Sequence, residues 1–328
     1  MEAGSCERCQ KIVGGTVTAL TFACPECRGT LERADMILSC KNRHMYPIRD
    51  GVYELLPKSV SALTIEEARY HAEQKTSWAE QNQIETLRNL QYHRSLLKVI
   101  ADRSIATSSI LEIGGGIGFD LELFLEMKPE FENYIFSEVS EELVAYVASR
   151  FNSPNITCCT LDAQRIPFAD GQFDCVFMIA ALHHLPDIGG TLNEMARVTK
   201  VGGVICCGIE PSRWWLKLLG RLKWLIRAVL PQKEHSAADE QADGLSVRDF
   251  VRFGEMNKLR LLQCEPVWLF CGFIHYGLEF VYRFFRLKKR IRLPIAVEKF
   301  IVQMDSMLLR FPGIRDLSWH NSVIYQKL

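Results

Sequence analysis

The chain has 328 residues, of which 48% are hydrophobic and 24% charged, a composition typical of a globular protein with a large domain and a small one. Its 39 Lys and Arg residues balance 39 Asp and Glu residues, which excludes wholesale electrostatic attraction to nucleic acid. No window approaches the ~18 consecutive apolar residues of a membrane span, and the opening MEAGSCERCQ lacks the pattern of a secretory leader. We therefore expect a cytoplasmic protein whose early cysteines bind metal rather than form disulfides.

The first 57 residues contain a pattern of metal ligands. Three cysteines and a histidine have the spacing C-x2-C-x12-C-x3-H: Cys24, Cys27, Cys40 and His44. Two pairs of soft ligands joined by a spacer of hairpin length suit tetrahedral zinc. A further pair, Cys6 and Cys9, forms an alternative four-cysteine set with the first two of these. One zinc ion takes four ligands, so we favour the first set and assign no role to Cys6 and Cys9. Four protein ligands leave no position for water, which predicts a structural zinc.

The sequence from residue 22 to 57 resembles the zinc ribbon at the start of the bacterial rRNA guanine methyltransferases. It also resembles the small zinc-ribbon activators that partner tRNA and protein methyltransferases. The likeness rests on the ligand spacing and on CKNRHMYPIRDGVYELLP, which begins at Cys40. It implies a zinc-ribbon module over residues 1–57. The polar, helix-prone residues 58–104 that follow predict a helical linker or lid.

From residue 108 to about 210, short β-branched runs alternate with helical patterns. Such alternation predicts an α/β fold with a parallel sheet and helices on both faces. We expect strands at 108–113, 133–138, 155–159, 173–180 and 203–209, followed later by 258–270 and 319–326. We expect helices near 117–127, 140–151 and 191–199.

The first strand leads into a loop with three glycines at a spacing of two: Gly114, Gly116 and Gly118. Glycines let the backbone approach a ligand that a Cβ would exclude, and the helix that follows offers N–H groups to an anion. A dinucleotide fingerprint would require glycine at its sixth position, where this chain has Phe119. The loop by itself does not identify the ligand, but it departs from the dinucleotide fingerprint at this position.

The form E-x-G-x-G-x-G that begins at Glu112, with the elements after it in order, resembles the class I S-adenosylmethionine-dependent methyltransferases over about 108–210. The likeness implies a Rossmann-like, seven-stranded methyltransferase domain over 105–328 with S-adenosyl-L-methionine (SAM) as cofactor. It implies that Glu138 accepts hydrogen bonds from the ribose hydroxyls, a role that suits its two acceptor oxygens. It also implies that Asp162 lies against the adenine amino group. The expected cofactor-binding residues are Glu112, Gly114, Gly116, Gly118, Glu138, Asp162, Ala163 and Ala180.

Each acidic residue of this set also has a purely structural explanation. Glu112 could solvate a strand end, Glu138 could cap the next helix, and Asp162 could occupy a turn. It is less plausible that all three structural explanations hold at once, so the three acidic residues together favour a cofactor site.

Two histidines, His183 and His184, follow the fourth strand at the end of the sheet where open α/β folds bind ligands. Methyl transfer requires an aligned nucleophile, and it requires a base only when the acceptor arrives protonated. Either histidine could take that proton, although His-His-Leu-Pro often only shapes the loop in the family that the chain resembles.

Basic and aromatic residues alternate over 211–232 and 281–292, within helical insertions expected at 211–232 and 273–315. The pattern is typical of helices that bind a membrane surface, but RNA binding or ordinary covering helices also explain it. We predict a small-molecule or lipid-linked acceptor, with a hydroxyl as the favoured atom and peripheral contact with the inner membrane surface. The alternative is methylation of an rRNA or tRNA base, and a third interpretation is a non-catalytic SAM-binding partner subunit.

Overall fold

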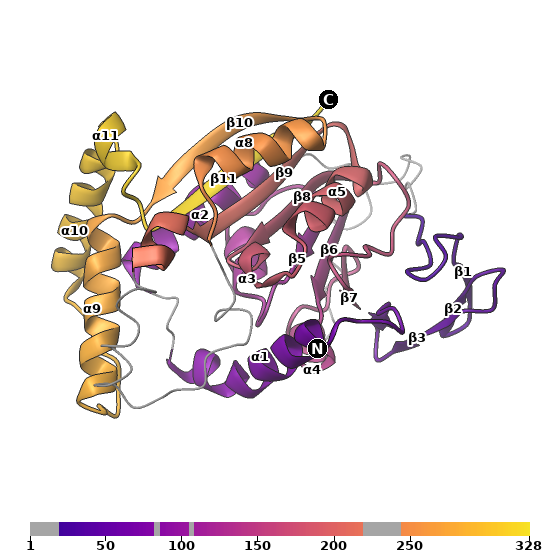
Figure 1. Ribbon diagram of the computed structural model, residues 1–328. Helices are drawn as coiled ribbons and strands as arrows, with labels where there is room; N and C mark the ends of the chain where they lie inside the picture. Colours follow the sequence, from indigo (N-terminus) through magenta and orange to yellow (C-terminus); the bar gives the residue numbers. More distant parts are fainter. Residues whose placement is uncertain (1–19, 82–85, 105–107, 219–243) are drawn as a thin grey trace, which may run out of the picture.

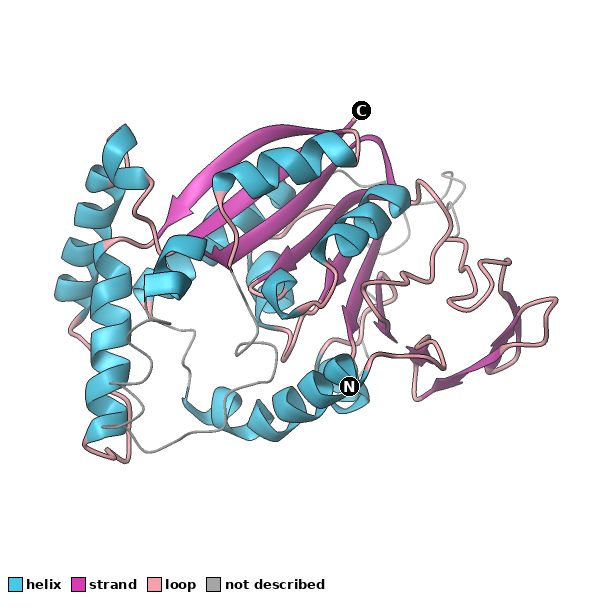
Figure 2. Ribbon diagram, in the orientation of Figure 1, coloured by secondary structure: helices cyan, strands magenta, loops and turns pink. Residues whose placement is uncertain are grey.

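The computed structural model describes residues 20–81, 86–104, 108–218 and 244–328 (Figure 1). The described residues form one eleven-stranded sheet, and Figure 2 shows helices on both faces of its seven-stranded central part. In order across the sheet, the strands are β7 (Ile156–Thr160), β6 (Asn133–Glu138), β5 (Ser109–Ile113), β8 (Phe173–Ile179), β9 (Thr199–Pro211), β11 (His320–Lys327) and β10 (Leu259–Val267). The first five are parallel, and β11 is antiparallel to both of its neighbours. The expected Rossmann-like, seven-stranded fold is confirmed.

Five helices pack on the two faces of the sheet: α2 (Leu87–Arg103), α3 (Phe119–Glu126), α4 (Glu141–Arg150), α5 (Ile188–Val198) and α8 (Val247–Met256). Successive side chains of β5 point to opposite faces, as in any strand. Leu111 packs in the core beneath α5 and α8, whereas Ile110 packs in the core beneath α2, α3 and α4. Burial on both faces explains why the parallel strands are continuous apolar runs in the sequence.

Three expected boundaries differ clearly from the structure. The strand expected at 203–209 is longer and begins at Thr199, and the strand expected at 258–270 ends at Val267, before the next helix begins. The third difference is the start of α5. Helix α5 begins at Ile188, three residues before the predicted start, although Gly189 and Gly190 follow immediately. The side chain of Asp187 accepts a hydrogen bond from the backbone N–H of Gly190 at 2.8 Å. This cap stabilises the first turn and offsets the low helix propensity of the glycines.

The zinc-ribbon segment, residues 20–57, extends the central sheet. Its strands are β1 (Glu32–Ala34), β2 (Ile37–Ser39), β3 (Met45–Arg49) and β4 (Val52–Glu54). Each of these strands pairs antiparallel with the next, and β4 then pairs in parallel with β7. The ribbon therefore continues the methyltransferase sheet at its β7 edge.

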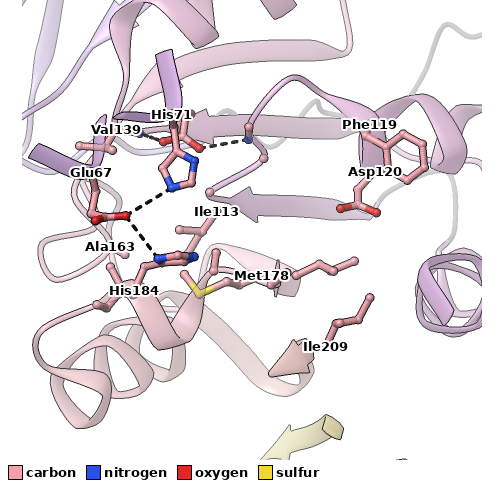
Figure 3. A pocket seen from close by; sticks show the side chains of 18 of the residues that line it. Glu67, His71, Ile113, Phe119, Asp120, Val139, Ala163, Met178, His184 and Ile209 are labelled. Atoms are coloured by element: carbon pink, nitrogen blue, oxygen red, sulfur yellow. Dashed lines mark hydrogen bonds and ion pairs between the residues drawn. The ribbon is translucent and has the colours of Figure 1, made fainter. Parts of the chain in front are cut away.

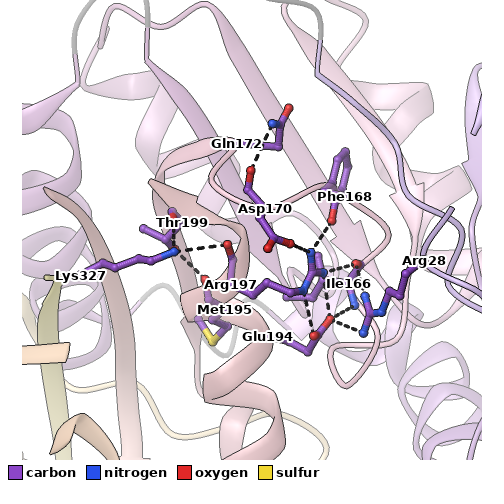
Figure 4. Close-up of polar contacts among 10 residues, drawn as sticks. All are labelled: Arg28, Ile166, Phe168, Asp170, Gln172, Glu194, Met195, Arg197, Thr199 and Lys327. Atoms are coloured by element: carbon purple, nitrogen blue, oxygen red, sulfur yellow. Dashed lines mark hydrogen bonds and ion pairs between the residues drawn. The ribbon is translucent and has the colours of Figure 1, made fainter. Parts of the chain in front are cut away.

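A network of arginines and carboxylates also anchors the ribbon to α5 (Figure 4). Arg28, next to Cys27, forms an ion pair with Glu194 at 2.8 Å. Arg197 contacts the other oxygen of the same carboxylate at 3.0 Å, and it also pairs with Asp170. Glu194 is buried between these two cations, and charge-assisted contacts of this kind are strong. The contact between Arg28 and Glu194 therefore fixes the ribbon against the domain.

The remaining helices lie outside the alternating core. Helix α1 (Ala62–Gln81) follows the ribbon, and α9 (Phe270–Phe284), α10 (Ile295–Leu308) and α11 (Pro312–Arg315) connect β10 to β11 at one end of the molecule (Figure 1). Residues 213–218 are helical, whereas the rest of the expected insertion at 211–232 lies mainly outside the described residues. Among the described helices, none is long and apolar enough to cross a membrane.

Candidate active site

A cavity of about 420 Å³ lies at the carboxyl ends of β5, β6, β7 and β8 (Figure 3). Its floor is the glycine loop and the strand ends, and residues of α1, α2 and the segment before α9 cover it. The volume falls in the usual range of small-ligand sites, and open α/β sheets bind ligands at this edge.

The backbone of the glycine loop adopts a left-handed conformation that would be strained for residues other than glycine. Gly114, Gly116 and Gly118 have φ values of +69°, +55° and +78°. A Cβ on Gly116 would have no protein atom within 4 Å, and this residue lines the cavity, so the space beside it is left for a ligand. A Cβ on Gly115 would overlap the ring of Phe136. The sequence pattern alone does not single out Gly115, because its constraint comes from the neighbouring strand.

Glu138 ends β6 with its carboxylate fixed at the cavity wall. One oxygen accepts a hydrogen bond from the N–H of Gly116 at 3.0 Å, and the other accepts one from Val139 at 2.7 Å. The cap of α4 is Ser140, whose hydroxyl accepts from Leu143, so helix capping does not account for Glu138. The carboxylate is thus held by the same loop that borders the cavity.

Glu112 lies behind the loop rather than in the cavity lining. Its carboxyl group is buried and accepts a hydrogen bond from the hydroxyl of Tyr134 at 2.6 Å. Burial, and secondarily the charge of Asp120, raise the pKa of Glu112 to about 8. Gly118 is also outside the lining, since it is the N-cap of α3 and packs against Val147.

Asp162, Ala163 and Ala180 all line the cavity, as do Gly114 and Gly116. The Asp162 carboxylate accepts a hydrogen bond from the N–H of Gln164 at 2.9 Å, which fixes the turn after β7. Ala180 has a φ of +52°, unusual for a residue other than glycine, at the end of β8. The structure therefore brings six of the eight expected cofactor-binding residues to one cavity.

The two histidines of the loop after β8 have different surroundings. Nδ1 of His183 lies 2.8 Å from the buried carboxylate of Glu210, and this residue is not part of the cavity lining. His184 does line the cavity, and its Nδ1 lies 3.3 Å from Oε2 of Glu67 (Figure 3). Of the pair, only His184 is placed to meet a molecule in the cavity.

Helices α1 and α2 contribute residues that the sequence analysis missed. Glu67 and His71 reach the cavity from α1, and His93 reaches it from α2 with its Nδ1 2.7 Å from Asp120. The signal for the first two was a Glu and a His four residues apart in a predicted helix, a spacing that puts both on one face. The lining contains four carboxylates and no Lys or Arg among the described residues: Glu67, Asp120, Glu138 and Asp162.

The ligand set expected in the ribbon is also brought together. The four donor atoms of Cys24, Cys27, Cys40 and His44 all lie within 4.8 Å of one another. Nδ1 of His44 is 3.3 Å from Sγ of Cys24 and 3.5 Å from Sγ of Cys40. A hydrogen bond from the backbone N–H of Gly29 is the main reason why the pKa of Cys27 is lowered to about 6, which favours the thiolate that metals bind. Cys6 and Cys9 lie outside the described residues.

Comparison with known proteins supports the assignment of the central domain to the methyltransferases. Residues 111–207, which run from β5 into β9, match the family model described as "Methyltransferase domain". A ubiquinone/menaquinone biosynthesis C-methyltransferase of Cupriavidus necator is 30% identical over 111 residues, which cover 33% of this chain and 45% of that protein. A malonyl-[acyl-carrier protein] O-methyltransferase of Acetivibrio thermocellus is 26% identical over 111 residues, covering 34% and 38%. The matched region spans less than half the length of these relatives.

Solved structures of methyltransferases share the fold. The phosphoethanolamine N-methyltransferase 2 of Haemonchus contortus, in complex with SAM, has a TM-score of 0.54 at 15% identity and covers 83% of this chain and 61% of that one. The geranyl diphosphate C-methyltransferase of Streptomyces coelicolor has a TM-score of 0.50 at 12% identity, covering 73% and 79%. These structures show the shared fold, and the family match over residues 111–207 with the related methyltransferase sequences shows that the chain contains a class I SAM-dependent methyltransferase domain.

Proposed function

We propose that the chain transfers the methyl group of SAM to a small-molecule or lipid-linked acceptor bound in the cavity. The observation that carries the proposal is the cavity itself. The glycine loop, Glu138 and Asp162 form one wall, and His184 lies on the wall formed by the loop after β8. Both partners of a transfer reaction would meet there.

The residues of the first wall fit SAM. The carboxylate of Glu138 suits a vicinal diol, and Asp162 lies where an amino group could donate to it. The open side of Gly116 leaves room for the ligand chain. The excess of carboxylates around the cavity favours a ligand with a positive charge. When bound, SAM would supply an activated methyl group on a sulfonium centre.

The rest of the cavity suits a compact acceptor with an apolar part. Met178, Ile209 and Trp268 line it, and the covering helices limit the access of water, which competes as a nucleophile. His184 would receive or hold the proton of the acceptor. His183, through Glu210, would keep the loop in place as a positioning residue.

Support for a lipid-linked acceptor comes from the helices between β10 and β11. Large aromatic side chains are exposed on α9, α10 and the turn after α9: Phe280, Phe284, Phe285 and Phe300. Lys288 and Lys289 are exposed beside this surface. Aromatic residues flanked by cations bind the interface of anionic membranes. We therefore propose peripheral contact with a membrane through this end of the molecule.

We also propose that Cys24, Cys27, Cys40 and His44 bind a structural zinc ion. Support comes from the donor set and the closeness of the four atoms. The ion pair of Arg28 with Glu194 of α5 favours a ribbon that stabilises the domain over a ribbon that binds the substrate by itself.

The test is methyl transfer from radiolabelled SAM into a cell extract that is then separated into RNA, protein, lipid and small-molecule pools. At a SAM concentration near the dissociation constant of the wild type, we expect label in the lipid or small-molecule pool with the wild-type chain and much less label with Glu138→Ala. Label confined to RNA would favour base methylation instead. No label in any pool, with SAM still bound, would favour a non-catalytic partner subunit.

A further inference from the structure

A carboxylate lies between two imidazole rings in the wall of the cavity (Figure 3). Glu67 and His71 share one face of α1, and His184 comes from the loop after β8. Oε2 of Glu67 is 3.4 Å from Nε2 of His71 and 3.3 Å from Nδ1 of His184. The three donor atoms all lie within 4.8 Å of one another. Two segments more than a hundred residues apart in the sequence thus converge on one point.

The two distances are slightly long for direct hydrogen bonds, and they equal the separation of two ligands on a tetrahedral metal ion. Hydrogen bonds between N–H and O usually span roughly 2.7–3.2 Å. Ligands held at 2.0–2.1 Å by a tetrahedral ion lie about 3.3–3.4 Å apart, whereas neighbouring ligands of an octahedral ion lie about 3.0 Å apart. The observed 3.4 Å and 3.3 Å therefore match the edges of a tetrahedron.

The chemistry of the donors points the same way. Two imidazoles and one carboxylate are a ligand set that zinc accepts in catalytic sites. Glu67 is buried, with 5% of its surface exposed, and a buried carboxylate is costly unless a cation lies beside it. The described residues around the cavity contribute further carboxylates and no Lys or Arg, so a metal ion would offset their charge.

We propose that Glu67, His71 and His184 bind one divalent ion of the zinc type and leave its fourth position open to the cavity. Three protein ligands with an open position distinguish a catalytic site from the closed four-ligand set of the ribbon. The open position would take an oxygen atom of the acceptor. A bound cation lowers the pKa of a hydroxyl group, so the ion would take over the task of a general base from His184.

The chemical role of this ion rests on the proposed function, whereas the binding of the ion does not. The acceptor hydroxyl would release its proton to solvent when it binds the cation. An oxygen lone pair would then form the new bond to the methyl carbon while the carbon–sulfur bond breaks. The electron pair of that bond stays on sulfur, which becomes a neutral thioether.

The test is the metal content of the full chain after dialysis against Zn²⁺ or Co²⁺. We expect about two ions per chain for the wild type and about one for Glu67→Gln and for His71→Ala. Glu66→Gln is the matched control, because Glu66 is the exposed neighbour on the same helix, and it should keep both ions. With Co²⁺, the ion that remains in Glu67→Gln should show the thiolate charge-transfer bands of the ribbon. The ion that remains in Cys40→Ser should lack them.

Circular dichroism and thermal melting of each variant would check that the fold is retained. About one ion in the wild type, unchanged in Glu67→Gln, would overturn the proposal and leave a carboxylate–histidine contact without metal. Calorimetry with SAM on the same samples separates the two claims. A chain that binds SAM but holds only the ribbon ion would refute this inference alone. A chain that holds two ions without binding SAM would refute the proposed function alone.

Discussion

Removal of the Glu138 carboxylate should weaken SAM binding by one to two orders of magnitude. Hydrogen bonds to a charged group contribute about 1.5–3 kcal/mol. Since every ~1.4 kcal/mol changes affinity tenfold, Glu138→Ala should raise the dissociation constant roughly 10- to 150-fold. The structure favours the upper part of this range. Alanine would also remove the acceptor for the N–H of Gly116, 3.0 Å away, and so loosen the loop beside the ligand.

Isothermal titration calorimetry with SAM measures this effect directly. Glu138→Gln keeps the size of the side chain and one acceptor oxygen but loses the charge, so its affinity should lie between those of the wild type and Glu138→Ala. Glu141→Ala, an exposed change in the first turn of α4, should leave affinity unchanged. Equal affinities of the wild type and Glu138→Ala would refute the assignment of this carboxylate to the ribose.

Three further predictions concern other parts of the chain. Cys40→Ser should lose the ribbon metal in elemental analysis, because Cys40 belongs to the cluster of donors among the described residues. Cys6→Ser should keep the metal, and the reverse result would favour the four-cysteine set. Glu112 is protonated in the folded chain up to a pKa of about 8, so its contribution to stability is complete below the pKa of the unfolded chain and is lost as pH rises toward 8. Between the pKa of the unfolded chain and pH 8, the free energy of unfolding of the wild type should fall, relative to that of Glu112→Gln, by roughly 1.4 kcal/mol per pH unit. Denaturant titrations would measure this, and parallel pH profiles of the two proteins would contradict the raised pKa of Glu112. Phe285→Ser should weaken the salt-sensitive co-sedimentation of the chain with anionic vesicles. Met45→Ser should not weaken it, because Met45 is equally exposed but lies at the other end of the molecule. A wild-type chain that does not sediment with the vesicles at low salt would refute the proposed membrane contact.

Local patterns were sufficient to predict most of the central sheet. The parallel strands are buried on both faces, so each is a short apolar run, and the glycine loop marks the first turn. The role of the acidic residue at the end of β6 was predicted from the resemblance to the methyltransferase family. The structure places this residue at the cavity, at the edge where the ends of the parallel strands meet. The clustering of Cys24, Cys27, Cys40 and His44 was predicted from spacing alone, because their separation is short.

The sequence could not reveal features that depend on distant packing. The pairing of β4 with β7 joins residues about a hundred positions apart, and no local pattern encodes that neighbour. The surroundings of Glu112 are decided by Tyr134 on the next strand, which turns a strand-end carboxylate into a buried hydrogen-bonded group. The position of α1 over the cavity brings Glu67 to His184, and only the folded chain shows that His183 is directed to Glu210 instead.

The structure of the full chain with S-adenosylhomocysteine would test the central claim most directly. We predict that the ribose hydroxyls lie within hydrogen-bond distance of Glu138 and that the adenine lies beside Asp162. We also predict that the sulfur faces the part of the cavity lined by His184. A ligand bound elsewhere, or one whose ribose makes no contact with Glu138, would contradict the account.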